Sequence, residues 1–204
     1  MKFPASALAF CPSLLAAVAS AQGDGTAAPA SPYPLQSDPF FLKLQSSTAE
    51  LDGQYLASYH SGAAIEQLGL DGREKPSDTR LYYLNYTSYA PEVDEEPVGI
   101  LTWNLPLGND PFKVSSGLVF QKNETSDVTM MVFYPGPPQE EQMLVGFDAE
   151  EKLFAYVDGE AVQEWFFCST YYGGYNYNAL TWVEGGVATH ESCHGVDVVR
   201  EFSG

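Results

Sequence analysis

The chain has 204 residues, with 27 acidic against 9 basic side chains and a formal net charge of −18. A surface this acidic repels nucleic-acid phosphates and anionic lipid headgroups, so neither nucleic acid nor a membrane is expected as a partner. The length suits one domain with a full hydrophobic core.

The amino-terminal residues have the pattern of a secretory signal peptide. An apolar, alanine-rich stretch over 5–19 ends at the small residues Ala19-Ser20-Ala21, which predicts a signal peptide over 1–21 and a secreted protein. The apolar stretch is too short to span a bilayer as a helix. Residues 22–37 are small and contain three prolines, which predicts a flexible leader before a domain over 38–204.

Short strand-like runs then recur between turn signals such as Asp52-Gly53, Asp71-Gly72 and Asp158-Gly159. Only residues 63–68 are predicted to be helical, over one or two turns. The predicted fold is all-β, a single compact antiparallel domain of about ten to twelve short strands. A sandwich, a barrel and a trefoil-like arrangement all stay open, because no repeat of fixed period is visible. The expected strands cover 40–44, 54–60, 81–84, 98–103, 117–120, 128–134, 143–147, 153–157, 164–168, 179–183 and 196–199.

The cysteines and glycosylation signals agree with export. Cys11 leaves with the signal peptide, so Cys168 and Cys193 remain and are predicted to form a disulfide in an oxidising compartment. Two Asn-X-Ser/Thr tripeptides begin at Asn85 and Asn123, at the ends of expected strands, and are predicted to be glycosylated.

One stretch matches a catalytic pattern but not its context. Residues 190–194 read His-Glu-Ser-Cys-His, as in zinc peptidases, where a helix brings both imidazoles onto one face. Gly185-Gly186 precede the match and Gly195 follows it, so no helix is expected. We therefore expect no catalytic residues, no metal site and no cofactor. A secreted hydrolase, either a zinc-dependent peptidase or a carboxylate glycosidase, is the alternative function.

The aromatic stretch after the first cysteine of the pair is the better candidate for a function. Tyr172, Tyr175, Tyr177 and Trp182 lie among glycines and asparagines, which suits flat aromatic faces that stack on sugars or contact proteins. The alternative is a long hairpin whose aromatic residues cover the core. His60 is expected to be partly buried rather than to act as a base.

Two parts of the sequence carry a family resemblance. Residues 40–44 and 55–64 open the domain, and Trp165-Phe166-Phe167-Cys168 and 192–199 lie near its carboxyl end. In these residues the chain resembles a group of small secreted fungal proteins of uncharacterised function, with a more distant similarity to the phialide-type fungal cell wall protein. The resemblance implies export, a cysteine bridge near the carboxyl end and a β-rich fold, and it transfers no catalytic residues.

The predicted function is that of a secreted, non-enzymatic fungal glycoprotein of the cell wall or extracellular surface. Its expected partner is a cell wall polysaccharide or a surface protein.

Overall fold

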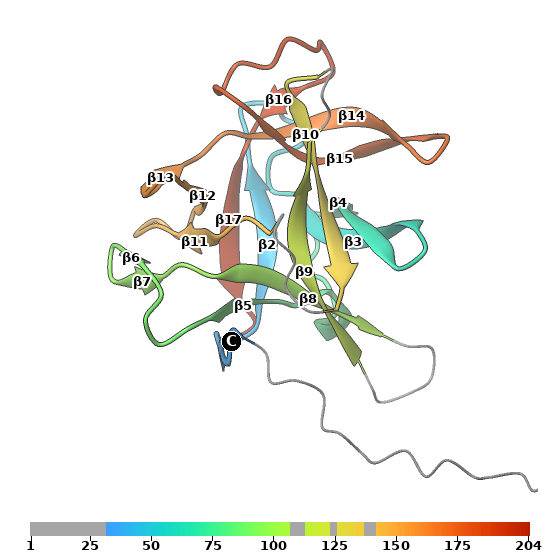
Figure 1. Ribbon diagram of the computed structural model, residues 1–204. Coiled ribbons are helices and arrows are strands. Elements are labelled where there is room, and N and C mark those ends of the chain that lie inside the picture. The colour runs from blue at the N-terminus through green and yellow to red at the C-terminus, as the bar shows by residue number, and fades with distance from the viewer. Residues whose placement is uncertain (1–31, 107–112, 123–125, 137–141) are drawn as a thin grey trace, which may run out of the picture. The chain divides into compact units, whose positions relative to one another are not determined.

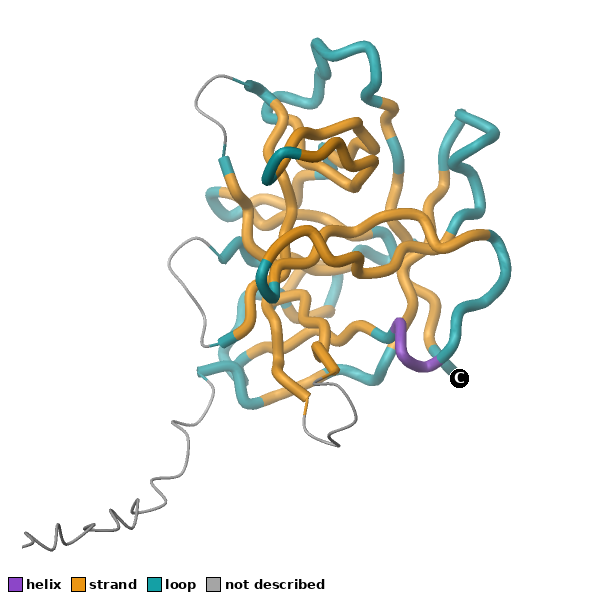
Figure 2. The backbone as a smooth tube through the Cα atoms, turned by 90° about the vertical axis from the view of Figure 1, so that its right-hand side faces the viewer, coloured by secondary structure: helices purple, strands orange, loops and turns teal. Residues whose placement is uncertain are grey.

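The computed structural model describes residues 32–106, 113–122, 126–136 and 142–204. Strands dominate these residues, and the helical structure within them is a single 3₁₀ turn, η1, at Asp78–Arg80 (Figure 2). This confirms the predicted all-β class. The strands are β1 (Leu35–Gln36), β2 (Phe40–Gln45), β3 (Tyr55–Gly62), β4 (Ile65–Gly72), β5 (Tyr82–Tyr86), β6 (Glu92–Val93), β7 (Glu96–Pro97), β8 (Ile100–Pro106), β9 (Lys113–Gln121), β10 (Val128–Pro135), β11 (Val145–Phe147), β12 (Leu153–Val157), β13 (Glu160–Val162), β14 (Trp165–Tyr172), β15 (Tyr175–Val183), β16 (His194–Gly195) and β17 (Asp197–Phe202).

Six of these strands close into a barrel. In ring order they are β2, β5, β8, β11, β12 and β17, each antiparallel to the next. Three junctions rest on one residue pair each: Phe40↔Tyr82 joins β2 to β5, Gly99↔Val145 joins the start of β8 to β11, and Lys152↔Val199 joins the start of β12 to β17. The ring joins the two ends of the domain, since β17 pairs with β2 along the full length of both strands (Figure 1). Closure gives every barrel strand two neighbours.

Three long hairpins, β3–β4, β9–β10 and β14–β15, complete the fold. Each one lies in the sequence between two barrel strands, and the hairpins meet one another: β10 pairs with both β4 and β15, and β15 lies against β4. The domain therefore consists of three consecutive parts, which run from β2 to β5, from β8 to β11 and from β12 to β17. Each part contributes two barrel strands and one hairpin. This is a trefoil arrangement, which decides among the three alternatives that the sequence left open.

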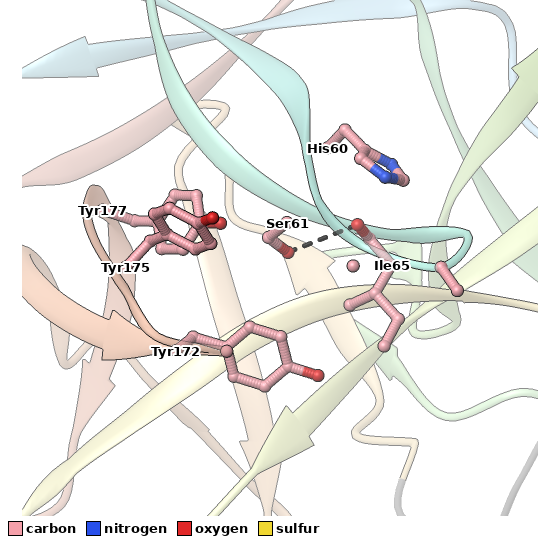
Figure 3. Close-up of a pocket in the computed structure, with 9 residues that line it drawn as sticks. His60, Ser61, Ile65, Tyr172, Tyr175 and Tyr177 are labelled. Carbon is pink, nitrogen blue, oxygen red and sulfur yellow. Dashed lines mark hydrogen bonds between the residues drawn. The ribbon is translucent and has the colours of Figure 1, made fainter.

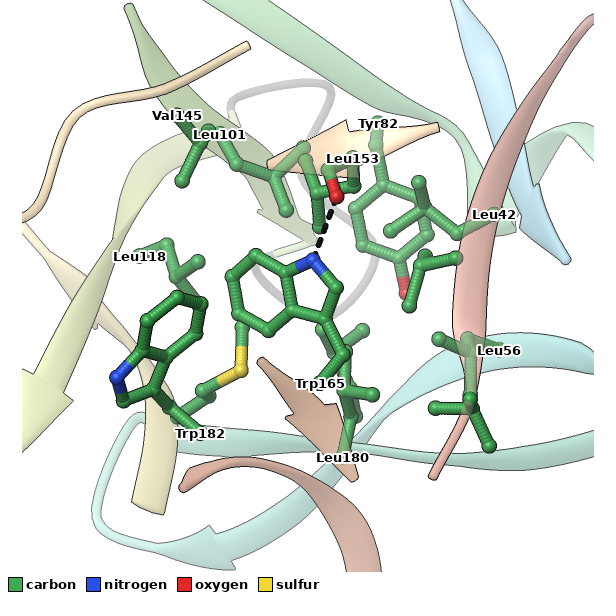
Figure 4. Close-up of a cluster of buried hydrophobic side chains, with 14 of the residues drawn as sticks. Leu42, Leu56, Tyr82, Leu101, Leu118, Val145, Leu153, Trp165, Leu180 and Trp182 are labelled. Atoms are coloured by element: carbon green, nitrogen blue, oxygen red, sulfur yellow. Dashed lines mark hydrogen bonds between the residues drawn. The ribbon is translucent and has the colours of Figure 1, made fainter. Parts of the chain in front are cut away.

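The hydrophobic core fills the barrel and continues beneath the hairpins. Alternate residues of the longer strands belong to this core, such as Phe40, Leu42 and Leu44 of β2, as the two-residue period of a strand requires. Trp165 lies near the centre, with Trp182 at 4.8 Å and Phe120 at 6.0 Å between ring centroids, and its indole N–H donates to the Leu153 carbonyl (Figure 4). Burying an apolar side chain of this kind stabilises the fold by about 1.5–3 kcal/mol.

The prediction of a helix over residues 63–68 is wrong. Ala64 has φ of 58° and forms the turn of the β3–β4 hairpin, and residues from Ile65 onward extend as β4. Pairing of Ser58 with Leu68 across this hairpin places Leu68 in the core. Cross-strand packing therefore overrides the local helical pattern.

The amino-terminal boundary also differs from the expected one. Leu35 and Gln36 form β1 and pair with Tyr86 and Asn85 of β5, so the end of the expected leader is part of the sheet. The predicted signal peptide and the first ten residues of the leader lie outside the described residues. None of the described segments forms a helix with the length and apolar character needed to cross a bilayer.

Candidate binding groove

The aromatic stretch predicted as a binding surface forms the end of the β14–β15 hairpin. Gly173 and Gly174 make its turn with φ of 58° and 94°, the positive values that a two-residue hairpin turn requires. Tyr172 pairs directly with Tyr175, and Thr170 pairs with Tyr177. Directly paired residues share a face of a hairpin, so the three tyrosines project from one face of this hairpin, and Tyr171 projects from the other.

The three tyrosines form one wall of a groove of about 640 Å³, which we call the tip groove. The opposite wall is the turn of the β3–β4 hairpin, with His60, Ser61 and Ile65 (Figure 3). The two hairpins lie close together here, since a Cβ added at Gly62 would be in ordinary van der Waals contact with the Tyr172 ring, at 3.6 Å. The groove volume falls within the range of about 300–1,000 Å³ that is usual for small-molecule sites.

A second groove of about 460 Å³ adjoins the first between β4 and β15, and we call it the inner groove. His60 and Tyr177 line both grooves. Tyr59 covers Gly69 here: a Cβ at position 69 would meet its ring at 2.9 Å. The remaining lining residues of the inner groove are Gln67, Leu70, Phe167, Asn178 and Ala179.

Two groove tyrosines are held as neutral phenols. Burial raises the pKa of Tyr59, and its hydroxyl donates to the Leu70 carbonyl at 2.9 Å and the Asp71 carboxylate at 3.0 Å, the latter adding to the rise. Burial also raises the pKa of Tyr172, reinforced by its neighbour Tyr134. At neutral pH these groups present aromatic faces and hydrogen-bonding hydroxyls rather than charge.

The tip groove does not hold an activated nucleophile. Ser61 donates its hydroxyl hydrogen to the Ile65 carbonyl at 3.3 Å, and His60 contacts the nearly buried Glu66 carboxylate at 3.2 Å instead of Ser61. The His60 side chain is 69% exposed, which corrects the expectation that it is partly buried. In the described part of the chain, no group of three or more His, Cys, Asp or Glu side chains is placed to hold a metal.

The structure separates the predicted binding residues. Tyr172, Tyr175 and Tyr177 line the tip groove, as above, but Trp182 does not belong to this surface. It is 6% exposed and packs edge-to-face against Trp165 and Phe120 in the core. The strand alternation that turns Tyr177 outward turns Trp182 inward, since the two positions differ by an odd number of residues.

The other predicted sites have different outcomes. Cys168 and Cys193 are joined by a disulfide, which confirms that prediction. Asn85 lies at the β1–β5 pairing, where its side-chain oxygen accepts a hydrogen bond from Gln36 at 2.7 Å. Asn123 lies outside the described residues. Glycosylation of either asparagine stays a prediction.

The peptidase-like segment is not helical. His190 contacts the Ser192 hydroxyl at 2.7 Å in a turn, and His194 begins the short strand β16, paired with Phe167. An extended segment does not bring the two imidazoles onto one helical face, so the geometry on which the zinc-peptidase motif depends is absent from this segment.

Sequence reasoning missed Tyr59 and Gln67, which line the inner groove. Gln67 was part of the segment assigned to a helix, and nothing in its neighbourhood marked it as functional. The sequence did contain a signal for Tyr59. In the expected strand over 54–60, side chains alternate between the two faces, and Tyr59 falls on the face that points away from the core.

A family model described as a domain of unknown function (DUF7907) matches residues 37–202. Searches of curated proteins and of solved structures returned no significant match. The match covers nearly all of the described trefoil, including both grooves and the disulfide. The chain therefore belongs to the DUF7907 family.

Proposed function

We propose that the protein is an exported, non-enzymatic glycoprotein that binds carbohydrate at the cell exterior, with cell wall polysaccharide as its ligand. The observation that carries this proposal is the tip groove, where three tyrosines from one hairpin face the turn of another. Aromatic rings with polar edges suit sugars, whose rings have an apolar face and a rim of hydroxyls.

Three further features support this proposal. The net charge of −18 disfavours polyanions, whereas a neutral polysaccharide meets no such repulsion. The disulfide between Cys168 and Cys193 suits an oxidising compartment, where such bonds persist. The absence of an activated nucleophile at Ser61 agrees with a binding role for this groove.

The test compares two exposed tyrosines of the same hairpin. Tyr175 is 69% exposed and lines the tip groove, whereas Tyr171 is 71% exposed and lies on the opposite face. We expect Tyr175→Ala to weaken retention on isolated wall polysaccharide about fivefold, the equivalent of one stacking contact of about 1 kcal/mol. Tyr171→Ala should bind as the unchanged protein does, and neither variant should alter the melting temperature.

Tyr177→Ala adds a second measurement, because Tyr177 is half-buried and lines both grooves. This change should reduce both retention and melting temperature. Equal retention of the unchanged protein, Tyr175→Ala and Tyr171→Ala would contradict the proposal. So would binding to a surface protein with no measurable affinity for any wall polysaccharide.

A further inference from the structure

Gln67 is a buried side chain whose hydrogen-bonding groups have no partner within the described structure. It is 2% exposed, and both its amide nitrogen and its amide oxygen are buried without a hydrogen bond. The residue belongs to β4 and lines the inner groove. Nearly all buried polar groups in proteins are paired, so an amide that lacks both partners calls for an explanation.

Packing alone does not require an amide at this position. Leu68, the next residue, points into the core, so Gln67 points to the opposite face of the hairpin, toward the inner groove. An apolar side chain of similar size would fill the same space without an unpaired donor and acceptor. The amide is therefore better explained by a ligand that enters this groove.

The chemistry of the amide restricts the ligand. A primary amide presents a donor and an acceptor side by side in one plane. Two hydroxyls on adjacent sugar carbons match this pair, because one accepts from the N–H and the other donates to the oxygen. An N-acetyl group does not match, since its trans peptide-like amide has its N–H and C=O on opposite sides.

We infer that Gln67 is a specificity-determining residue, which pairs with two adjacent free hydroxyls of a sugar bound in the inner groove. This inference rests on the proposed function and names its ligand class: neutral glycans with unsubstituted vicinal diols. The amide is covered in the unliganded chain, so a groove side chain turns aside on binding.

The test uses three soluble glycans. The first is an α-mannan rich in vicinal diols, the second is the same mannan after periodate cleavage and borohydride reduction, and the third is a linear β-1,3-glucan. Periodate cleaves the bond between carbons that carry adjacent hydroxyls, and the internal residues of a β-1,3-glucan have no such pair. We expect the protein to bind the mannan at least tenfold more tightly than the other two.

Gln67→Leu should weaken mannan binding at least tenfold and leave the melting temperature unchanged or raised, because no hydrogen bond is lost in the free protein. Gln121→Leu is the matched control: Gln121 also has a buried, unpartnered side-chain oxygen, but it lies on β9 outside both grooves. This variant should bind mannan as the unchanged protein does.

The outcomes separate the two proposals. If Tyr175→Ala weakens mannan binding and Gln67→Leu does not, the role of Gln67 is overturned and carbohydrate binding stands. Equal binding of intact and periodate-treated mannan also overturns the role of Gln67. If the unchanged protein binds none of the three glycans and no other wall polysaccharide, the proposed function falls and this inference falls with it.

Discussion

Arg200 and Glu151 are joined twice, once through the backbone and once through their side chains. The Arg200 amide donates to the Glu151 carbonyl at 3.0 Å, and its guanidinium Nε donates to the Glu151 carboxylate. A second carboxylate, that of Glu96, accepts from the same guanidinium at 3.0 Å. The Arg200 side chain is only 4% exposed and lies over the rings of Phe147 and Phe202. The pair therefore fastens β17 to the turn that precedes β12, where barrel closure depends on a single bridge.

We expect Glu151→Gln to lower the free energy of unfolding by about 2 kcal/mol, since a hydrogen bond between charged groups contributes about 1.5–3 kcal/mol when the donor is buried. Denaturant unfolding measures this change. The control is Asp197→Asn, which removes the more exposed ion pair with Lys152 at 2.8 Å. Exposed pairs contribute little, so this variant should unfold as the unchanged protein does. Equal destabilisation by both changes would show that burial of Arg200 is not the deciding factor.

The disulfide should hold the long segment between β15 and β17 against the hairpin. Cys168 is buried in β14, and Cys193 lies 25 residues later, just before β16. Replacing both by alanine should cost about 3.5 kcal/mol of stability, the loop-entropy value for a ring of this size. The exported protein should show no alkylatable thiol by intact mass until it is reduced. Two alkylated cysteines in the unreduced protein would contradict the bridge.

Gly99 should not tolerate alanine. An added Cβ would lie 2.3 Å from the backbone oxygen of Asn85, and backbone cannot move aside as a flexible side chain can. Gly99 also makes the single bridge to Val145 that joins β8 to β11. Gly99→Ala should lower the melting temperature sharply, whereas Gly195→Ala should change it little, because the nearest atom there is a Phe166 ring carbon at 3.8 Å. Similar melting temperatures would argue against a tight contact at Gly99.

The protein should contain no stoichiometric zinc, because His190 and His194 do not share a helical face. Elemental analysis of the purified protein measures this directly. The double variant His190→Ala/His194→Ala should have the metal content of the unchanged protein. Stoichiometric zinc that disappears in the double variant would restore a metal site to this segment.

Local features of this fold were predictable, and long-range features were not. The run over 128–134 is β10, and Asp158-Gly159 forms a hairpin turn with positive φ at both residues, because alternation and turn chemistry are written in neighbouring residues. The trefoil depends on pairs such as Phe40↔Tyr82, which join strands about forty residues apart. The three thirds of the trefoil need only an apolar residue of some kind at equivalent core positions. Their sequences can therefore differ so much that no repeat is visible.

The candidate site shows the same division. The tyrosines of the tip groove were identified because glycines and asparagines around them favour an exposed turn. Trp182 was placed with them wrongly, because its burial depends on strand register rather than on composition. Gln67 gave no signal, since the lack of a hydrogen-bond partner is a property of the folded chain.

Tyr82 should make the protein lose stability at high pH. The side chain is fully buried, stacks on Phe133 with ring centroids 5.8 Å apart, and has the Ser58 hydroxyl 3.3 Å from its own. Burial raises the pKa of Tyr82 well above the usual value of about 10, although the Ser58 contact lowers it slightly. Ionisation of this phenol is therefore easier in the unfolded chain than in the folded one.

The sign of the effect follows from proton binding. Below about pH 10 the phenol is protonated in both states, and its contribution to stability is fully present. As the pH rises from about 10 toward the folded-state pKa, only the unfolded chain releases the proton, so the free energy of unfolding falls by about 1.4 kcal/mol per pH unit from this group. Denaturant unfolding at pH 8, 10 and 11 should show this fall, and Tyr82→Phe should make it shallower by that amount. Tyr89→Phe, at a residue that is 84% exposed, should reproduce the curve of the unchanged protein. Identical slopes for Tyr82→Phe and the unchanged protein would contradict this prediction, because they would mean that Tyr82 ionises as readily in the folded chain as in the unfolded one.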